Sequence, residues 1–168
     1  MDRRNGVDRF FTTGSVVWEL ESSDKYEAIR EVIYRAPVFS TIPGLDLREF
    51  AELVVNREHL LSTGFGHGVA VAHGRTPAVE ESHIALGVSR HGIDYVSPDG
   101  QPVHLLFVVA NHPEQQMDYL QIISTLARLL RNDAFRRELL SCVRGDEVEQ
   151  KMYTAFSEYI RPSAAYGS

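Results

Sequence analysis

The stretch from Ser62 to Arg75 holds the side chains best suited to chemistry. It reads STGFGHGVAVAHGR, in which three glycines alternate through a turn and four apolar residues lead to His73, next to Gly74. Glycine has no Cβ, so its backbone can take a positive φ and approach another group closely. A short apolar run after such a turn predicts a buried strand. Because imidazole is both a nucleophile and an acid–base group near neutral pH, His73 is predicted to be a reactive histidine at a strand end.

The composition predicts one soluble globular domain. The chain has 168 residues, of which 43% are hydrophobic and 24% are charged. Its net charge of −6 argues against nucleic-acid binding, which depends on basic patches. Cys142 is the only cysteine, and the histidines lack metal-ligand spacing, so neither a disulfide nor a metal site is expected, and no cofactor is predicted. Without a membrane-length apolar run or a signal peptide, the expectation is a cytoplasmic protein with no membrane insertion.

Sequence periodicity predicts the elements that must position His73. Helices are predicted over 24–35, from Asp46 through Arg57 to Leu61, and over 120–130, 133–143 and 146–159. Strands are predicted at 69–72, 83–88, 93–96 and 103–109, while 15–20 is either a strand or an apolar lead-in. Strands in the middle of the chain with helices at both ends predict an α/β fold, a mixed β-sheet flanked by helices.

An ordered set of motifs resembles a known family. The resemblance lies in three motifs: Arg57-Glu58, Ser62-Thr63-Gly64 and the run Gly-x-Gly-Val-Ala-Val-x-His-Gly-Arg. With these motifs the sequence resembles the IIA domains of the bacterial sugar phosphotransferase system, of the fructose/mannitol type. Within that type they resemble the stand-alone nitrogen-regulatory branch. The similarity extends to Asp99-Gly100-Gln101-Pro102-Val103. It implies a IIA-like sandwich fold, with a phosphocarrier domain at 14–160, an N-terminal arm at 1–13 and a flexible tail at 161–168.

The resemblance implies a phosphocarrier, a phosphotransfer component rather than a turnover enzyme. In this family a histidine takes a phosphoryl group from the phosphorylated histidine of a small carrier protein, and His73 maps to it. Arg57 maps to an arginine beside that histidine, where a guanidinium grips phosphate oxygens. Thr63 or Ser62 would donate a hydroxyl hydrogen bond, and the glycine turn with Gly64 would offer backbone N–H groups to an anion.

Two positions depart from the family pattern. Ala72 stands where the family has proline before the reactive histidine, and Tyr119 stands where it usually has a second histidine. A phenol donates a hydrogen bond to phosphate but carries no positive charge. His67, in the glycine turn, is a candidate replacement for the missing histidine; a turn residue is its alternative. Tyr119 is either a phosphate ligand or an aromatic at the edge of the core.

Structural alternatives stay open for the two central residues as well. His73 taken alone also fits a hydrogen-bonded histidine at a strand end, and Arg57 also fits a cap of the preceding helix or a partner for Glu58 or Glu52. The phosphotransfer assignment requires an imidazole open to an incoming phosphoryl group with a guanidinium nearby.

Two function classes follow. The first is a phosphohistidine carrier whose donor is a histidine-containing phosphocarrier protein, with a regulatory rather than a transport role, because the chain shows no membrane or IIB domain. The second is a IIA-like binding module in which phosphorylation is weakened or lost. The regulatory target is not specified by the sequence, and a homodimer is left open.

Overall fold

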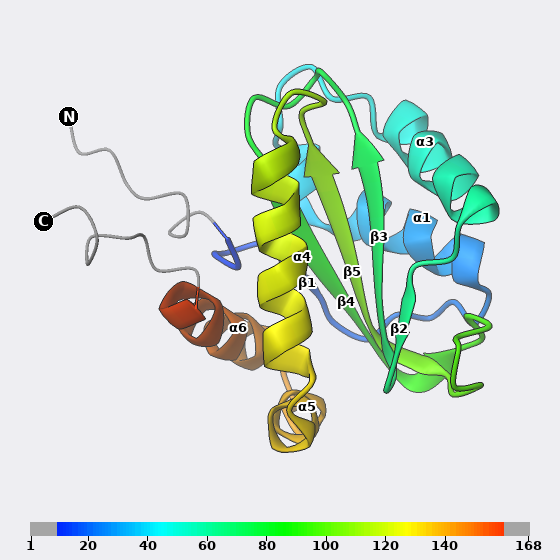
Figure 1. Cartoon of the computed structure of the whole chain (residues 1–168), viewed down its shortest axis with the longest axis vertical. Helices are drawn as coiled ribbons and strands as arrows, with labels where there is room; N and C mark the ends of the chain where they lie inside the picture. Colours follow the sequence, from blue (N-terminus) through cyan, green and yellow to red (C-terminus); the bar gives the residue numbers. More distant parts are fainter. Residues whose placement is uncertain (1–9, 160–168) are drawn as a thin grey trace, which may run out of the picture.

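A five-stranded sheet lies between two layers of helices (Figure 1). The computed structural model describes residues 10–159. The strand order is β1 (Val16–Val17), β4 (His83–Ile93), β5 (Val103–Asn111), β3 (Val69–Arg75) and β2 (Gly64–Gly66). β1 pairs with β4 and β3 with β5 in parallel, while the other two neighbouring pairs are antiparallel. The predicted mixed sheet flanked by helices is confirmed.

The helices divide between the two faces of the sheet (Figure 1). One face packs against α1 (Lys25–Arg35), α2 (Pro37–Ser40) and α3 (Leu47–Leu60), and the other against α4 (Gln116–Leu130), α5 (Asp133–Leu140) and α6 (Gly145–Tyr159). The carboxylates of Asp24 and Asp46 accept backbone N–H groups at the starts of α1 and α3, as the capping signatures predict. No helix within residues 10–159 is both long and apolar enough to cross a bilayer.

Strand β3 contributes to both hydrophobic cores. Ala70 and Ala72 belong to the core beneath α1 and α3, whereas Val69 and Val71 belong to the core beneath α4 and α6. Successive side chains of a strand point to opposite faces, so His73 lies on the α4 side. The next residue, Gly74, faces α3, which approaches its backbone closely.

Three element predictions need correction. β4 is one strand to Ile93 rather than two strands at 83–88 and 93–96, because a register shift between Val88 and Ile93 lets it continue. Residues 64–66 of the glycine turn pair with β3 as β2. The helix predicted over 133–143 ends at Leu140.

The predicted arm at 1–13 also extends too far. Phe10 and Phe11 are buried in the core beneath α4 and α6. Both rings pack edge-on against Phe156, with centroid distances of 5.3 and 5.4 Å. The packed part of the chain therefore includes residue 10, and the predicted tail at 161–168 lies outside the described residues.

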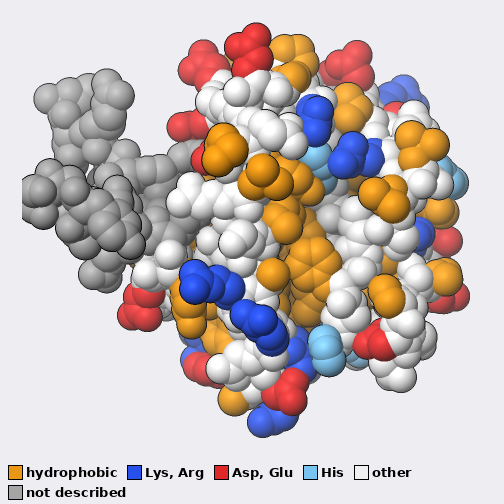
Figure 2. All heavy atoms as spheres, in the orientation of Figure 1, with side chains coloured by type: hydrophobic (Ala, Val, Ile, Leu, Met, Phe, Trp, Pro, Cys, Tyr) orange, Lys and Arg blue, Asp and Glu red, His pale blue; other side chains and the backbone are white. Residues whose placement is uncertain are grey.

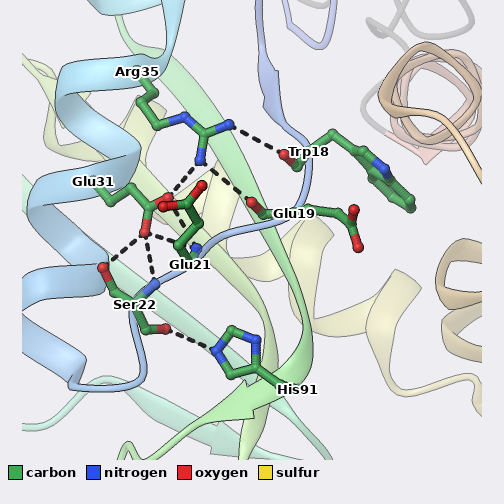
Figure 3. A network of polar contacts seen from close by, with 7 residues as sticks. All are labelled: Trp18, Glu19, Glu21, Ser22, Glu31, Arg35 and His91. Atoms are coloured by element: carbon green, nitrogen blue, oxygen red, sulfur yellow. Dashed lines mark hydrogen bonds and ion pairs between the residues drawn. The ribbon is translucent and has the colours of Figure 1, made fainter.

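A polar network fixes the segment between β1 and α1 (Figure 3). The Glu31 carboxylate accepts the backbone N–H groups of Glu21 and Ser22, the Ser22 hydroxyl and a guanidinium N–H of Arg35. Burial alone would raise the pKa of Glu31, but these donors outweigh it and lower that pKa. Because Ser22 also accepts from the His91 ring on β4, the network holds this segment against both α1 and the sheet.

Replacing Gly74 by alanine should destabilise the protein. The added Cβ would lie 2.7 Å from Val54 Cγ2 and 2.9 Å from Phe50 Cε1, so α3 must shift to accommodate it. We expect the free energy of unfolding to fall by about 1–3 kcal/mol in urea denaturation. The exposed substitution Ser62→Ala serves as the control. An unchanged unfolding midpoint for Gly74→Ala would contradict the close approach of α3.

Candidate functional site

His73 lies near the carboxyl end of β3 and is 1% exposed. Its Nε2 atom is 2.7 Å from Oδ1 of Asn111, the last residue of the neighbouring strand β5. The Asn111 amide donates to the carbonyl of His112, which leaves its oxygen facing the imidazole. Because an amide oxygen only accepts, the proton of the neutral ring resides on Nε2 and the lone pair on Nδ1. The Nδ1 atom is buried and has no hydrogen-bond partner.

Tyr119 covers the imidazole from the first turns of α4. The two rings are stacked, with centroids 3.8 Å apart and an interplanar angle of 18°. The phosphotransfer assignment predicts an imidazole open to an incoming group, and this prediction is wrong for the conformation observed. An aromatic ring in place of a histidine provides a flat apolar face that closes over His73.

Two guanidinium groups act on this ring pair. Burial lowers the pKa of His73, and the positive charges of Arg57, in the last turn of α3, and Arg75, at the end of β3, add to that shift. The same two charges oppose the rise that burial causes in the pKa of Tyr119. Within residues 10–159, neither guanidinium forms an ion pair or a hydrogen bond. The alternative in which Arg57 pairs with a neighbouring glutamate is not observed.

Those glutamates have other partners. Glu52 binds Arg30 at 3.2 Å, and Glu58 binds Lys25 at 3.1 Å. The site therefore holds two cations without a bound anion among the described residues, which is the charge arrangement that a phosphate group would complement.

The imidazole is neutral over the physiological pH range. Burial lowers the pKa of His73 to about 4; the bond to Asn111 opposes that shift, and Arg57 and Arg75 add to it. For Tyr119, burial outweighs the two arginines and raises its pKa. The site thus presents an uncharged nitrogen base beside two permanent positive charges.

Thr63 has no free hydroxyl donor for a phosphate. Its Oγ1 donates to Glu58 at 2.6 Å and lies 3.0 Å from the hydroxyl of Tyr95, while its backbone N–H also donates to Glu58. With the ion pair to Lys25, this buried network fixes the junction between α3 and β2 directly after Arg57. Ser62, which precedes Thr63, is exposed.

The structure does not bring His67 or Gly64 to His73. His67 lies in the turn before β3, six residues from His73, which is roughly 20 Å along an extended strand. Its backbone N–H donates to Asp99 at 2.7 Å, and its φ of +58° is the left-handed conformation of a turn residue. Gly64 pairs with Ala70, before the histidine end of the strand.

The His67 side chain instead lines a groove of about 290 Å³ between the β2–β3 turn and α4. Apolar side chains gather along the furrow on this face in Figure 2. This groove and the His73 site occupy opposite ends of β3.

Sequence reasoning did not identify Asn111 and Arg75 as site residues. Both follow from strand register, since Arg75 pairs with Asn111 and His73 with Val109 in the parallel ladder of β3 and β5. Parallel strands bring their carboxyl ends to the same edge of a sheet. The polar residues that end the two apolar runs, Arg75 and Asn111, were therefore the sequence signal from which these positions could have been identified.

The family model for the phosphoenolpyruvate-dependent sugar phosphotransferase system, EIIA 2, matches residues 9–153. The chain belongs to this family.

Relatives of this IIA domain include a fructose-specific phosphotransferase-system component and nitrogen regulatory proteins. A fructose-specific EIIABC component of Bacillus subtilis is 33% identical over 84% of the chain, which spans 22% of that protein. A nitrogen regulatory protein of Bradyrhizobium diazoefficiens is 32% identical over 71% of the chain and 76% of its own length. The crystal structure of nitrogen regulatory protein IIA-Ntr from Neisseria meningitidis superposes with a TM-score of 0.72 at 27% identity, covering 85% of this chain and 93% of that one.

The lowered pKa of His73 should make the stability of this IIA domain depend on pH. Below pH 6.5 the unfolded ring binds a proton that the folded ring does not accept until about pH 4. Because the unfolded state binds more protons, the free energy of unfolding falls as the pH falls. From this ring alone, we expect a loss of about 2 kcal/mol between pH 7 and pH 4.5.

The variant His73→Gln has no imidazole at this position, so its free energy of unfolding should lack the pH dependence that His73 causes. The difference in unfolding free energy between wild type and His73→Gln should therefore change by about 2 kcal/mol between pH 7 and pH 4.5. The exposed substitution Gln116→Ala serves as the control and should follow the wild type. Parallel pH curves for wild type and His73→Gln would contradict a buried neutral imidazole.

Proposed function

We propose that this protein is a cytoplasmic phosphocarrier that accepts a phosphoryl group on His73 from the phosphohistidine of a small carrier protein. The observation that carries the proposal is the neutral imidazole beside two guanidinium groups that have no anionic partner among the described residues. A lone pair is required for attack on phosphorus, and burial keeps it available. Arg57 and Arg75 supply the charge that the transferred group needs.

The transfer balances without a further reactant. The Nδ1 lone pair attacks phosphorus while the bond from phosphorus to the donor nitrogen breaks, and the donor imidazole leaves with that electron pair. The Nε2 proton stays on His73 and continues to be held by Asn111. His73 becomes a phosphoimidazolium, and a donor ring that carried a proton on its second nitrogen becomes neutral.

A regulatory role is supported by two of the relatives. The Bradyrhizobium and Neisseria proteins are both named as nitrogen regulatory proteins, and the chain covers most of each. We extend that role to this chain, with phosphorylation of His73 as the signal that a target protein reads. Phosphorylation adds about two negative charges to the surface near α4.

A binding module without phosphotransfer is the second candidate. The closed conformation favours it, because Tyr119 lies directly over the proposed acceptor. The two candidates differ in whether a competent donor labels the protein at all.

Substitution of His73 should abolish labelling. Incubation with phosphoenolpyruvate, the upstream kinase and its histidine-containing carrier should give acid-labile phosphate in the wild type and none in His73→Gln. His67→Gln, at the other end of β3, is the matched control and should label as the wild type does. Label that persists in His73→Gln would refute the assignment, and an unlabelled wild type with an active donor would favour the binding module.

Substitution of Arg57 should slow transfer more than it destabilises the fold. A half-buried guanidinium without an ion pair contributes little to stability, but its charge acts on the transferred group. We expect Arg57→Ala to label about 10²-fold more slowly, with an unfolding midpoint close to that of the wild type. Arg48→Ala, an exposed position on the same helix, is the control. A lowered midpoint with unchanged labelling per folded molecule would make Arg57 structural.

A further inference from the structure

We infer that Tyr119 determines donor specificity at His73, by closing the acceptor nitrogen to small phosphoryl compounds and admitting only a protein donor that displaces its ring. The donor-specificity part of this inference rests on the proposed function. The closure of His73 by Tyr119 can be tested without any phosphotransfer.

The cover over His73 is complete in this conformation. The imidazole is 1% exposed, and its Nδ1 atom is buried without a hydrogen-bond partner. A buried polar nitrogen without a partner carries a cost that water contact would relieve. A phosphoryl group bonded to that nitrogen also requires space that the closed site does not have. Reaction at His73 therefore needs an opening.

The opening is on the Tyr119 side of the ring. Asn111, which holds the other side, is fully buried with an exposed fraction of 0%, and β5 beneath it is part of the central sheet. Tyr119 is only partly buried and lies at the molecular surface. Of Asn111 and Tyr119, Tyr119 is thus the side chain that can leave without disturbing the core.

The start of α4 allows a side-chain movement while its backbone stays in place. Tyr119 stands in the first turn, where a long side chain has two favourable χ1 rotamers. Side chains next to Tyr119 tie the start of α4 to the segment before β4: the Ser82 hydroxyl donates to the Asp118 carboxylate at 2.5 Å, and the Gln115 side-chain amide donates to the carbonyl of Glu80 at 2.9 Å. The movement that uncovers His73 is therefore a rotation of the Tyr119 side chain.

A protein donor has contacts here that a small molecule lacks. Met117 and Leu120, two residues before and one residue after Tyr119 on α4, are 77% and 48% exposed. A partner that covers these two apolar side chains would gain buried area and could hold the displaced phenol ring. A small phosphoryl compound is too small to cover this surface, so it would meet the closed site. Tyr119 would also shield the neutral nitrogen from solvent between encounters.

The closure is tested first with diethylpyrocarbonate, a small electrophile that acylates neutral imidazole. Acylation of His73 is followed by peptide-resolved mass spectrometry, with the exposed His67 in the same chain as the internal reference. We expect slow reaction at His73 in the wild type and in Tyr119→Phe, which keeps the stacked ring. In Tyr119→Ala the rate at His73 should rise about tenfold relative to His67, while Leu120→Ala should leave it unchanged.

Donor specificity is then tested by comparing phosphoramidate with the phosphorylated carrier protein. Phosphoramidate delivers its phosphoryl group to His73 as its P–N bond breaks and ammonia leaves. Tyr119→Ala should raise the rate from phosphoramidate about tenfold without a matching rise from the carrier. Circular dichroism and the unfolding midpoint establish that each variant is folded.

Three outcomes overturn the inference. Acylation of wild-type His73 as fast as that of His67 would show that the site is already open, and an unchanged rate in Tyr119→Ala would show that another group closes it. An equal rise with both donors would remove the specificity role. If neither donor labels the wild type while Tyr119→Ala still increases acylation, the proposed function fails and the donor role with it, but Tyr119 remains the cover.

Discussion

The hydrogen bond between His73 and Asn111 is the contact on which the site depends. It joins the carboxyl ends of two parallel strands, and it fixes both the orientation of the imidazole and the nitrogen that carries the proton. Both residues belong to the β3–β5 ladder, so the backbone pairing of the central sheet sets the positions from which the two side chains meet. Tyr119 closes the remaining face, so the ring is held by one buried polar contact and one aromatic contact.

Burial and charge have opposite consequences for the two states of the proposed cycle. Before transfer, desolvation and two guanidinium groups disfavour an imidazolium, which keeps the lone pair free. After transfer, the same guanidinium groups face a phosphoryl dianion and become favourable. A second histidine at the Tyr119 position would add a titratable cation; tyrosine gives an uncharged cover instead. The site thereby depends on Arg57 and Arg75 for all of its positive charge among the described residues.

Sequence reasoning predicted the fold well because local signals agreed with the global pattern. The capping aspartates began both N-terminal helices, and the long apolar run of β5 marked the central strand. The predictions of site residues failed where strand register and buried hydrogen bonds, rather than local sequence, determine which side chains lie near His73. Thr63 and His67 looked close to His73 in sequence, but hairpin register moved His67 to the opposite end of β3, and a buried carboxylate occupied the Thr63 hydroxyl. Asn111 could be found only by aligning parallel strands, and the stacked position of Tyr119 required α4 to be docked.

The protonation state of His73 is the most direct test of this account, and ¹⁵N-detected NMR of histidine-labelled protein measures it. The account predicts that, from pH 8 to pH 5, Nε2 keeps the chemical shift of a protonated ring nitrogen and Nδ1 that of a nitrogen with a free lone pair. Signals of the two nitrogens that merge with a midpoint near pH 6.5 would show an ordinary solvated imidazole and contradict the buried neutral acceptor.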